Sequence, residues 1–191
     1  LAANQGLAEA QFNLGMMYVK GLGGPQDFTK ALEWFELAAN QGLAEAQFNL
    51  GCMYADGVGV VQDKETLGKQ CRKLNIPIDD LAVQSDDQNI KLLQEKIAIY
   101  WYQKLTEKGY AKAQYNLGLM YANGKGVVKD EKEAIRLYHL AADPNKDNSR
   151  NNGLAPAQYN LGIMFEYGKG VDKDVDKAVE WYLKAAAQDH A

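Results

Sequence analysis

Apolar residues recur at helical spacing near the start of the chain. Between residues 8 and 20 they stand three or four positions apart, which at about 100° per residue gathers them on one side of a helix. These residues are Ala10, Leu14, Met17 and Tyr18. The pattern predicts an amphipathic helix over about 8–20, which we call helix A.

A turn signal and a second helical pattern follow. Gly21 and Gly23 favour a tight turn, because glycine adopts positive φ without strain. Asp27 is the predicted N-cap of the next helix, helix B, where its carboxylate would accept bonds from free N–H groups. The buried face of helix B is predicted to carry Ala31, Trp34 and Ala38. We expect these Ala and Trp side chains to pack in the core.

This helix pair is one unit of an internal repeat. The motif Ala-x-Ala-Gln-aromatic-Asn-Leu-Gly begins at Ala8, Ala44, Ala111 and Ala155. The spacings of 36, 67 and 44 residues indicate a 36-residue unit with two insertions. Each unit continues with an aromatic residue, Gly-x-Gly, an Asp and an Ala-rich stretch. One helix pair cannot bury both of its faces, so we expect the units to stack.

The repeat resembles the Sel-1-like repeat family, a branch of the tetratricopeptide-like helical repeats. The pattern that carries the resemblance is Ala-x-Ala-x-x-x-Leu-Gly-x-x-Tyr-x-x-Gly-x-Gly-Val-x-x-Asp-x-x-Lys-Ala-x-x-Trp-x-x-x-Ala-Ala, and it covers nearly all of the chain outside the insertions. The departures are Gly24 for Val, Leu137 for Trp, Phe165 for Tyr and Asp189 for the closing Gly. The resemblance implies an all-α fold, a right-handed α/α superhelical solenoid of four helix-pair repeats. It also implies a non-catalytic adaptor, since the family has no shared catalytic residues.

We expect one solenoid domain over 1–191. The expected repeats are about 7–42, 43–109, 110–153 and 154–191, with insertions at 64–95 and 143–152. Residues 1–15 recur unchanged at 37–51, so the chain opens inside the tail of a repeat. We therefore expect it to be a piece of a longer array, and one alternative role is a spacer within that array.

The first insertion is the most individual segment. An apolar row predicts a short helix that Pro77 helps to end, and it consists of Leu67, Cys71 and Leu74. A second row predicts a helix B lengthened by roughly two turns. It consists of Ile90, Leu93, Ile97, Trp101 and Leu105. Two roles stay open for this helical insertion. It could be a structural addition that shields an edge of the solenoid, or a wall or lid that contacts a specific partner.

Charge and hydropathy narrow the classes of function. The net charge is −4 and the isoelectric point is about 5.3. The sequence therefore lacks the excess of basic residues that is typical of nucleic-acid-binding proteins. No apolar run reaches the roughly 18 residues of a membrane span. We expect no nucleic-acid partner and no membrane insertion. The sequence does not assign a compartment.

Candidate catalytic groups are few. The serines and histidines are Ser85, Ser149, His139 and His190. None lies in a nucleophile or zinc motif, so we predict no catalytic residue, no metal site and no cofactor. His139 is predicted to face solvent or to pack.

Cys52 and Cys71 are predicted to be reduced, because they replace nothing paired in the other units. The alternative function is a hydrolase of the cysteine-rich Sel-1-like type, acting on cell-wall or β-lactam-like substrates, although this chain lacks one Cys pair per repeat.

The second insertion matches part of a calcium loop. Oxygen-bearing residues occupy loop positions 1, 3, 5, 7 and 9, namely Asp143, Asn145, Asp147, Ser149 and Asn151. Position 12 is Leu154 instead of the bidentate carboxylate. We predict a polar loop without a specific metal.

The side of helix A opposite its core face is the predicted partner-binding face. It presents an aromatic residue and an Asn in every unit: Phe12 and Asn13, Phe48 and Asn49, Tyr115 and Asn116, Tyr159 and Asn160. A varied position supplies further specificity residues, Asp56, Asn123 and Tyr167. A carboxamide both donates and accepts, so the Asn residues could brace helices or bind a ligand peptide.

This face is also mildly acidic. Its acidic residues, Glu9, Glu45, Asp56 and Glu166, outnumber its basic ones, Lys20 and Lys112. Such a face suits a peptide with some positive charge. The sequence therefore predicts a protein-interaction scaffold or adaptor that binds a peptide or protein of unknown identity in a concave groove.

Overall fold

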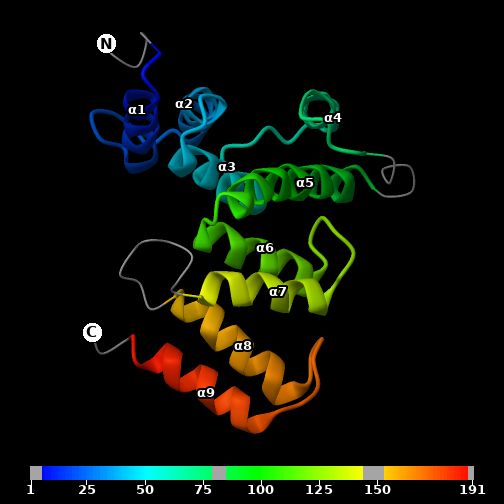
Figure 1. Ribbon diagram of the computed structural model, residues 1–191. Coiled ribbons are helices and arrows are strands. Elements are labelled where there is room, and N and C mark those ends of the chain that lie inside the picture. The colour runs from blue at the N-terminus through cyan, green and yellow to red at the C-terminus, as the bar shows by residue number, and fades with distance from the viewer. Residues whose placement is uncertain (1–5, 79–84, 144–152, 189–191) are drawn as a thin grey trace. The chain divides into compact units, whose positions relative to one another are not determined.

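The protein is all-α. The structure is a computed structural model that describes residues 6–78, 85–143 and 153–188, and within these residues it contains nine helices and no strand (Figure 1). The helices are α1 Ala8–Lys20, α2 Phe28–Asn40, α3 Ala44–Asp56, α4 Lys64–Lys73, α5 Asp86–Glu107, α6 Ala111–Asn123, α7 Glu131–Ala142, α8 Ala155–Tyr167 and α9 Val175–Ala186. The predicted all-α repeat fold is confirmed. By position, helix A corresponds to α1, α3, α6 and α8, and helix B to α2, α5, α7 and α9.

The chain forms two compact units, one ending at Tyr102 and the other beginning at Gln103. Within the first unit α1 pairs with α2, and α3 packs on α2. Within the second unit α6 pairs with α7, α8 packs on α7, and α8 pairs with α9. Helices α2 and α7 thus each contact two helices A, their own and the next.

Local signals end and begin the helices. Helix A stops in every unit at a left-handed glycine, which is Gly21, Gly57, Gly124 or Gly168. Asp27 then caps α2, its Oδ1 accepting a bond from the Lys30 N–H at 3.0 Å, and Asp174 does the same for α9 with Lys177. These bonds hold the pKa of both carboxyl groups below the usual range. The predicted N-cap at Asp27 is confirmed.

The second repeat departs from this pattern because the insertion follows its aspartate. Asp63 caps the inserted helix α4 instead of helix B, through a 2.8 Å bond from the Thr66 N–H. Helix α5 begins at a capping box, in which Ser85 and Gln88 each accept a bond from the other's backbone N–H. This Ser-x-x-Gln signal is present in the sequence, and the capping box was not predicted from it.

The inserted helix α4 packs within the first unit. The Leu67 and Cys71 side chains are buried, and the Cys71 thiol lies 4.0 Å from the Leu93 carbonyl oxygen of α5. Helix α4 ends where Asn75 takes a left-handed φ of 57° and the Ile76 N–H donates to the Cys71 carbonyl. This C-cap ends the helix just before Pro77, the residue predicted to help end it.

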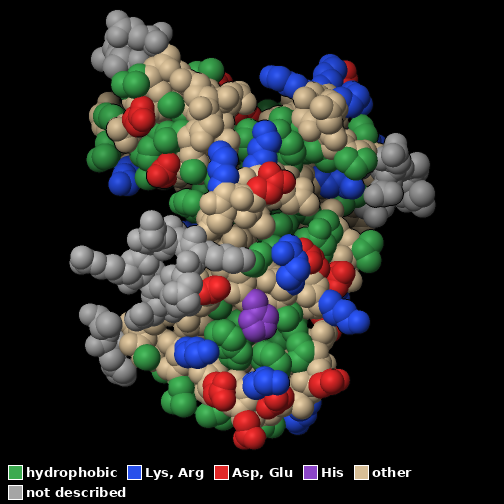
Figure 2. All heavy atoms as spheres, in the orientation of Figure 1, with side chains coloured by type: hydrophobic (Ala, Val, Ile, Leu, Met, Phe, Trp, Pro, Cys, Tyr) green, Lys and Arg blue, Asp and Glu red, His purple; other side chains and the backbone are tan. Residues whose placement is uncertain are grey.

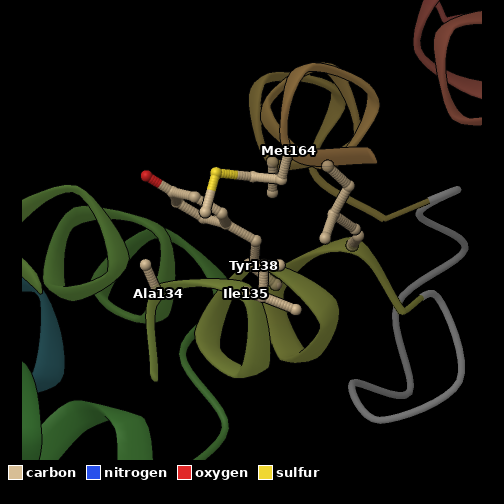
Figure 3. Close-up of a cluster of buried hydrophobic side chains, with 8 residues drawn as sticks. Ala134, Ile135, Tyr138 and Met164 are labelled. Carbon is tan, nitrogen blue, oxygen red and sulfur yellow. The ribbon is translucent and has the colours of Figure 1, made fainter. Parts of the chain in front are cut away.

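Helices α7 and α8 show how successive helices pack. Ile135 and Tyr138 of α7 are buried together with Leu161 and Met164 of α8. Met164 reaches from α8 toward Tyr138 (Figure 3). Alanines on both helices, such as Ala157, allow this close approach.

In the first repeat the most deeply buried ring of helix B is not the one predicted. Trp34 and Trp181 are only half-buried, whereas the next ring in the first unit, Phe35, is 1% exposed. Phe35 follows Ala31 by one helical turn and therefore faces helix A directly. Trp34 lies one position round the helix, at the edge of the core. At the same repeat position of α5, Trp101 is 4% exposed, as predicted.

Candidate functional site

Each predicted aromatic residue of helix A stacks on a ring of its own helix B. The four pairs, with centroid separations, are Phe12–Phe35 at 5.5 Å, Phe48–Tyr102 at 6.2 Å, Tyr115–Tyr138 at 6.0 Å and Tyr159–Tyr182 at 5.6 Å. A helix A glycine makes each pair possible. At Gly162, for example, a Cβ would lie 2.4 Å from the ring of Tyr182. The glycine of the motif's Leu-Gly therefore leaves the space in which the helix B ring packs.

The aromatic residues differ in exposure. Phe12, Phe48 and Tyr115 are half-buried, whereas Tyr159 is 54% exposed. Tyr167, two turns further along α8, is 64% exposed. The fourth repeat therefore presents the most accessible rings of the predicted partner-binding face.

The asparagines do not form one uniform ladder. Asn49 donates to the Glu45 carbonyl oxygen one turn back in α3, at 2.9 Å, and Asn123 donates to Leu119 in the same way at 2.8 Å. Asn160 instead shares a side-chain hydrogen bond with Tyr138 of α7, so it joins two successive helices. Asn13 and Asp56 are exposed, and Asn116 is half-buried.

The fourth repeat brings three tyrosines and one carboxylate together, and we call this set the α8 aromatic cluster: Tyr159, Glu166, Tyr167 and Tyr182. The Tyr182 hydroxyl donates to Glu166 Oε2 at 2.6 Å, and the Tyr167 hydroxyl also bonds to Glu166. Burial and the bond to Glu166 raise the pKa of Tyr182, and the same carboxylate raises the pKa of Tyr167. Both hydroxyls therefore keep their protons and donate to Glu166.

This cluster belongs to the fourth repeat alone. The position of Glu166 holds Val19, Ala55 or Ala122 in the other repeats. The hydroxyl of Tyr102, which corresponds to Tyr182, lies 3.5 Å from the Cys52 sulfur. The sequence predicted Tyr159 and Tyr167 and noted Glu166. It did not predict Tyr182, whose ring comes from helix B.

The motif also holds a buried glutamine that our sequence reading left without a role. It is Gln11, Gln47, Gln114 or Gln158. Gln47 donates to the Ala39 carbonyl oxygen at the end of α2 at 3.0 Å, and Gln158 donates to that of Ala142 at the end of α7 at 3.4 Å. The glutamine thus satisfies a helix-end carbonyl of the preceding helix B. Its recurrence as a polar residue inside an apolar motif was the signal that could have revealed this.

A pocket of 610 Å³ lies in the second unit between α7, α8 and α9. Its wall includes His139, Trp181 and Lys184, with the Lys184 ammonium 4.1 Å from the Trp181 ring centroid. His139 packs edge-on against Trp181 at 5.4 Å, and in Figure 2 the histidine lies at the surface beside apolar side chains. Partial desolvation and the charge of Lys184 lower the pKa of His139.

The described residues offer little catalytic chemistry. They contain no group of three or more His, Cys, Asp or Glu that could hold a metal ion. The Ser85 hydroxyl takes part in the cap of α5. Both cysteines are free thiols, and burial raises the pKa of Cys71 to about 11, which disfavours a nucleophilic thiolate. His190 and most of the calcium-loop positions, 145–151, lie outside the described residues.

Comparison with known proteins agrees with the repeat pattern. The Sel1 repeat model matches residues 8–43, 44–66, 91–110, 111–143 and 155–190. The chain belongs to the Sel1 repeat family. The unmatched stretch 67–90 contains most of α4 and the start of α5. No curated protein matches the chain.

Two solved structures share the Sel1 fold. A protective antigen of uropathogenic Escherichia coli strains, which displays an SLR fold, is 34% identical, with a TM-score of 0.74 over 98% of this chain and 32% of that one. A Sel1 repeat protein from Oxalobacter formigenes is 30% identical, with a TM-score of 0.69 over 96% of this chain and 60% of that one. This chain therefore spans about one third and three fifths of these relatives.

The family assignment bears on function at a general level. Sel1 repeat proteins generally mediate protein–protein interaction, and the family is typically a non-enzymatic scaffold. None of the helices in the described ranges is long and apolar enough to cross a membrane.

Proposed function

We propose that this chain is a protein-interaction scaffold that binds a peptide or protein segment in a concave groove formed by its helix A faces. The observation that carries the proposal is the exposure of Tyr159 and Tyr167 on α8. Contiguous exposed apolar groups mark interaction sites, and tyrosine is enriched among the anchor residues of protein interfaces. The family's general role supports the same conclusion.

The repeat architecture explains why helix A would carry the partner. Helix B uses both of its apolar flanks for packing, as in α7, where Ala134, Ile135 and Tyr138 are all buried. Helix A buries one side and leaves residues of the other side exposed, such as Asn13, Asp56 and Tyr167. Variation between repeats on that side, such as Asp56 against Tyr167, can then set specificity without loss of the core.

Site-specific photo-crosslinking tests this proposal. A photoreactive phenylalanine analogue at Tyr159 would sit on the proposed face. The same analogue at Val128, which is 88% exposed in a turn of the same unit, is the matched control. We expect cross-linked proteins, identified by mass spectrometry from the native cell, at position 159 that are missing at position 128. Identical products at both positions, or none specific to 159, would contradict the proposal.

A further inference from the structure

We propose that the α8 aromatic cluster is a binding site for an arginine side chain of the partner. The inference rests on the proposed function and specifies the chemistry of the segment that is bound. Its evidence is the juxtaposition of a partly buried carboxylate, Glu166, with the exposed rings of Tyr159 and Tyr167 and the half-buried ring of Tyr182.

The contacts place the four side chains in a continuous row. The rings of Tyr159 and Tyr182 are 5.6 Å apart, and the Tyr182 hydroxyl is 2.6 Å from Glu166. Tyr167 bonds to the same carboxylate. The row is held in place at Tyr182, whose ring packs closely against Gly162 and whose hydroxyl bonds to Glu166. A ligand would therefore meet fixed side chains, which reduces the entropy cost of binding.

The charge of the row selects a cation. An aromatic ring carries a negative face, so it attracts an ammonium or guanidinium group that lies over it. The chain supplies an internal example, because the Lys169 ammonium lies 5.6 Å from the Tyr167 ring centroid. Glu166 adds a full negative charge beside the rings. A carboxylate has about four acceptor sites, so the two tyrosine bonds leave room for further donors.

Arginine fits this arrangement better than lysine. The guanidinium group is planar, stacks on aromatic rings and offers parallel N–H donors that match a carboxylate. The guanidinium group is also less strongly hydrated than an ammonium group. It therefore loses less hydration free energy when it moves from water to the partly desolvated row. The other repeats lack the carboxylate at this position, with Val19, Ala55 and Ala122 in its place. The arginine site is therefore confined to the fourth repeat.

Peptide binding to the 191-residue chain tests the inference. The probes are three fluorescein-labelled peptides that alternate leucine with arginine, with lysine or with citrulline, the neutral isostere of arginine. Fluorescence anisotropy gives their dissociation constants. We expect the arginine peptide to bind about tenfold more tightly than the citrulline peptide, with lysine in between, in line with a cation–π contact plus a charged hydrogen bond.

Two variants locate the effect. Glu166→Gln should abolish most of the difference between the arginine and citrulline peptides, while leaving the citrulline affinity unchanged. Glu180→Gln removes an exposed carboxylate of α9 that lies outside the predicted partner-binding face. It is the matched control and should preserve the difference. Circular dichroism checks that both variants remain folded.

The outcomes separate this inference from the proposed function. If all three peptides bind equally, if none binds, or if Glu166→Gln preserves the arginine preference, the arginine site is wrong. If lysine binds more tightly than arginine, the planar recognition is wrong. Cross-linking at position 159 in any of these cases would leave the scaffold function standing without the arginine site.

Discussion

Helices α7 and α9 are the same helix B in two successive repeats, yet they differ in burial. Ile135 of α7 is 9% exposed, whereas Val179, at the same position of α9, is 51% exposed. Tyr138 is 2% exposed, whereas Tyr182 is half-buried. Helix α7 is covered by α8, and among the described residues no helix follows α9 to cover it in the same way. The next helix A, and not the helix B sequence, therefore decides what helix B buries.

The third and fourth repeats also differ in the exposure of side chains on the partner-binding face. Tyr115 and Tyr159 occupy one repeat position, but only Tyr159 is more than half exposed. Asn160 of α8 bonds to Tyr138, so α8 braces the ring beneath Tyr115. The third repeat is thus tied to its successor, whereas Tyr159 and Tyr167 of the fourth repeat are exposed among the described residues.

The largest expected effect is the loss of stability when the helix B tyrosines, Tyr138 and Tyr182, are replaced. Tyr138→Ala should lower the free energy of unfolding by about 3–5 kcal/mol, the range for loss of a large buried aromatic side chain. Tyr182→Ala should lower the free energy of unfolding clearly less, because the Tyr182 ring is only half-buried. Urea denaturation followed by circular dichroism measures both. Equal costs would show that coverage by α8 is not what stabilises α7.

The second effect concerns partner binding. Tyr159→Ala should weaken binding of the cross-linked partner by about 1–3 kcal/mol, within the range of interface anchors, with little loss of helicity. Tyr115→Ala is the matched variant and should lower the melting temperature more, since its half-buried ring packs on Tyr138. Titration calorimetry and thermal melts separate the two properties. A Tyr159→Ala protein that unfolds early yet binds normally per folded molecule would assign this ring to packing.

A smaller effect is expected for the aliphatic pair. Ile135→Val removes one buried methylene and should cost about 0.5–1.5 kcal/mol. Val179→Ala removes more atoms from an exposed position and should still cost no more than about 0.5 kcal/mol. The midpoints of urea denaturation give both values. A larger cost at Val179 would mean that α9 is covered by another part of the protein.

The smallest effect is a pH dependence at the start of α9. The folded-state pKa of Asp174 is lowered by the Lys177 N–H and ammonium groups. Its contribution is therefore present above the unfolded pKa, near 3.8, and is lost as the pH falls through the lower folded value. Asp174→Asn keeps an N-cap without a charge. Thermal melts between about pH 6 and 3 should fall less steeply for this variant than for the parent protein. Parallel curves would contradict the assignment.

The sequence alone determined the features that depend on neighbours in the chain. The repeat predicted helix pairs, the glycines predicted where helix A ends, and Asp27 was correctly predicted as an N-cap. Each depends on hydrogen bonds and backbone angles within a few residues, so the local sequence is sufficient. The exception within this class was Ser85, whose capping box with Gln88 was present in the sequence and overlooked.

Tertiary structure decided the features that depend on which helix packs next. It placed Phe35 instead of Trp34 in the core, because a rotation of one residue around helix B cannot be chosen without knowing the direction of helix A. It also brought Tyr182 to Glu166, sixteen positions earlier in the chain. Side chains of one repeat look alike in sequence, but their burial and bonding depend on the neighbouring helix. That is why the fold could be predicted from the repeat, while the accessible cluster on α8 emerged only from the packing of α9 against it.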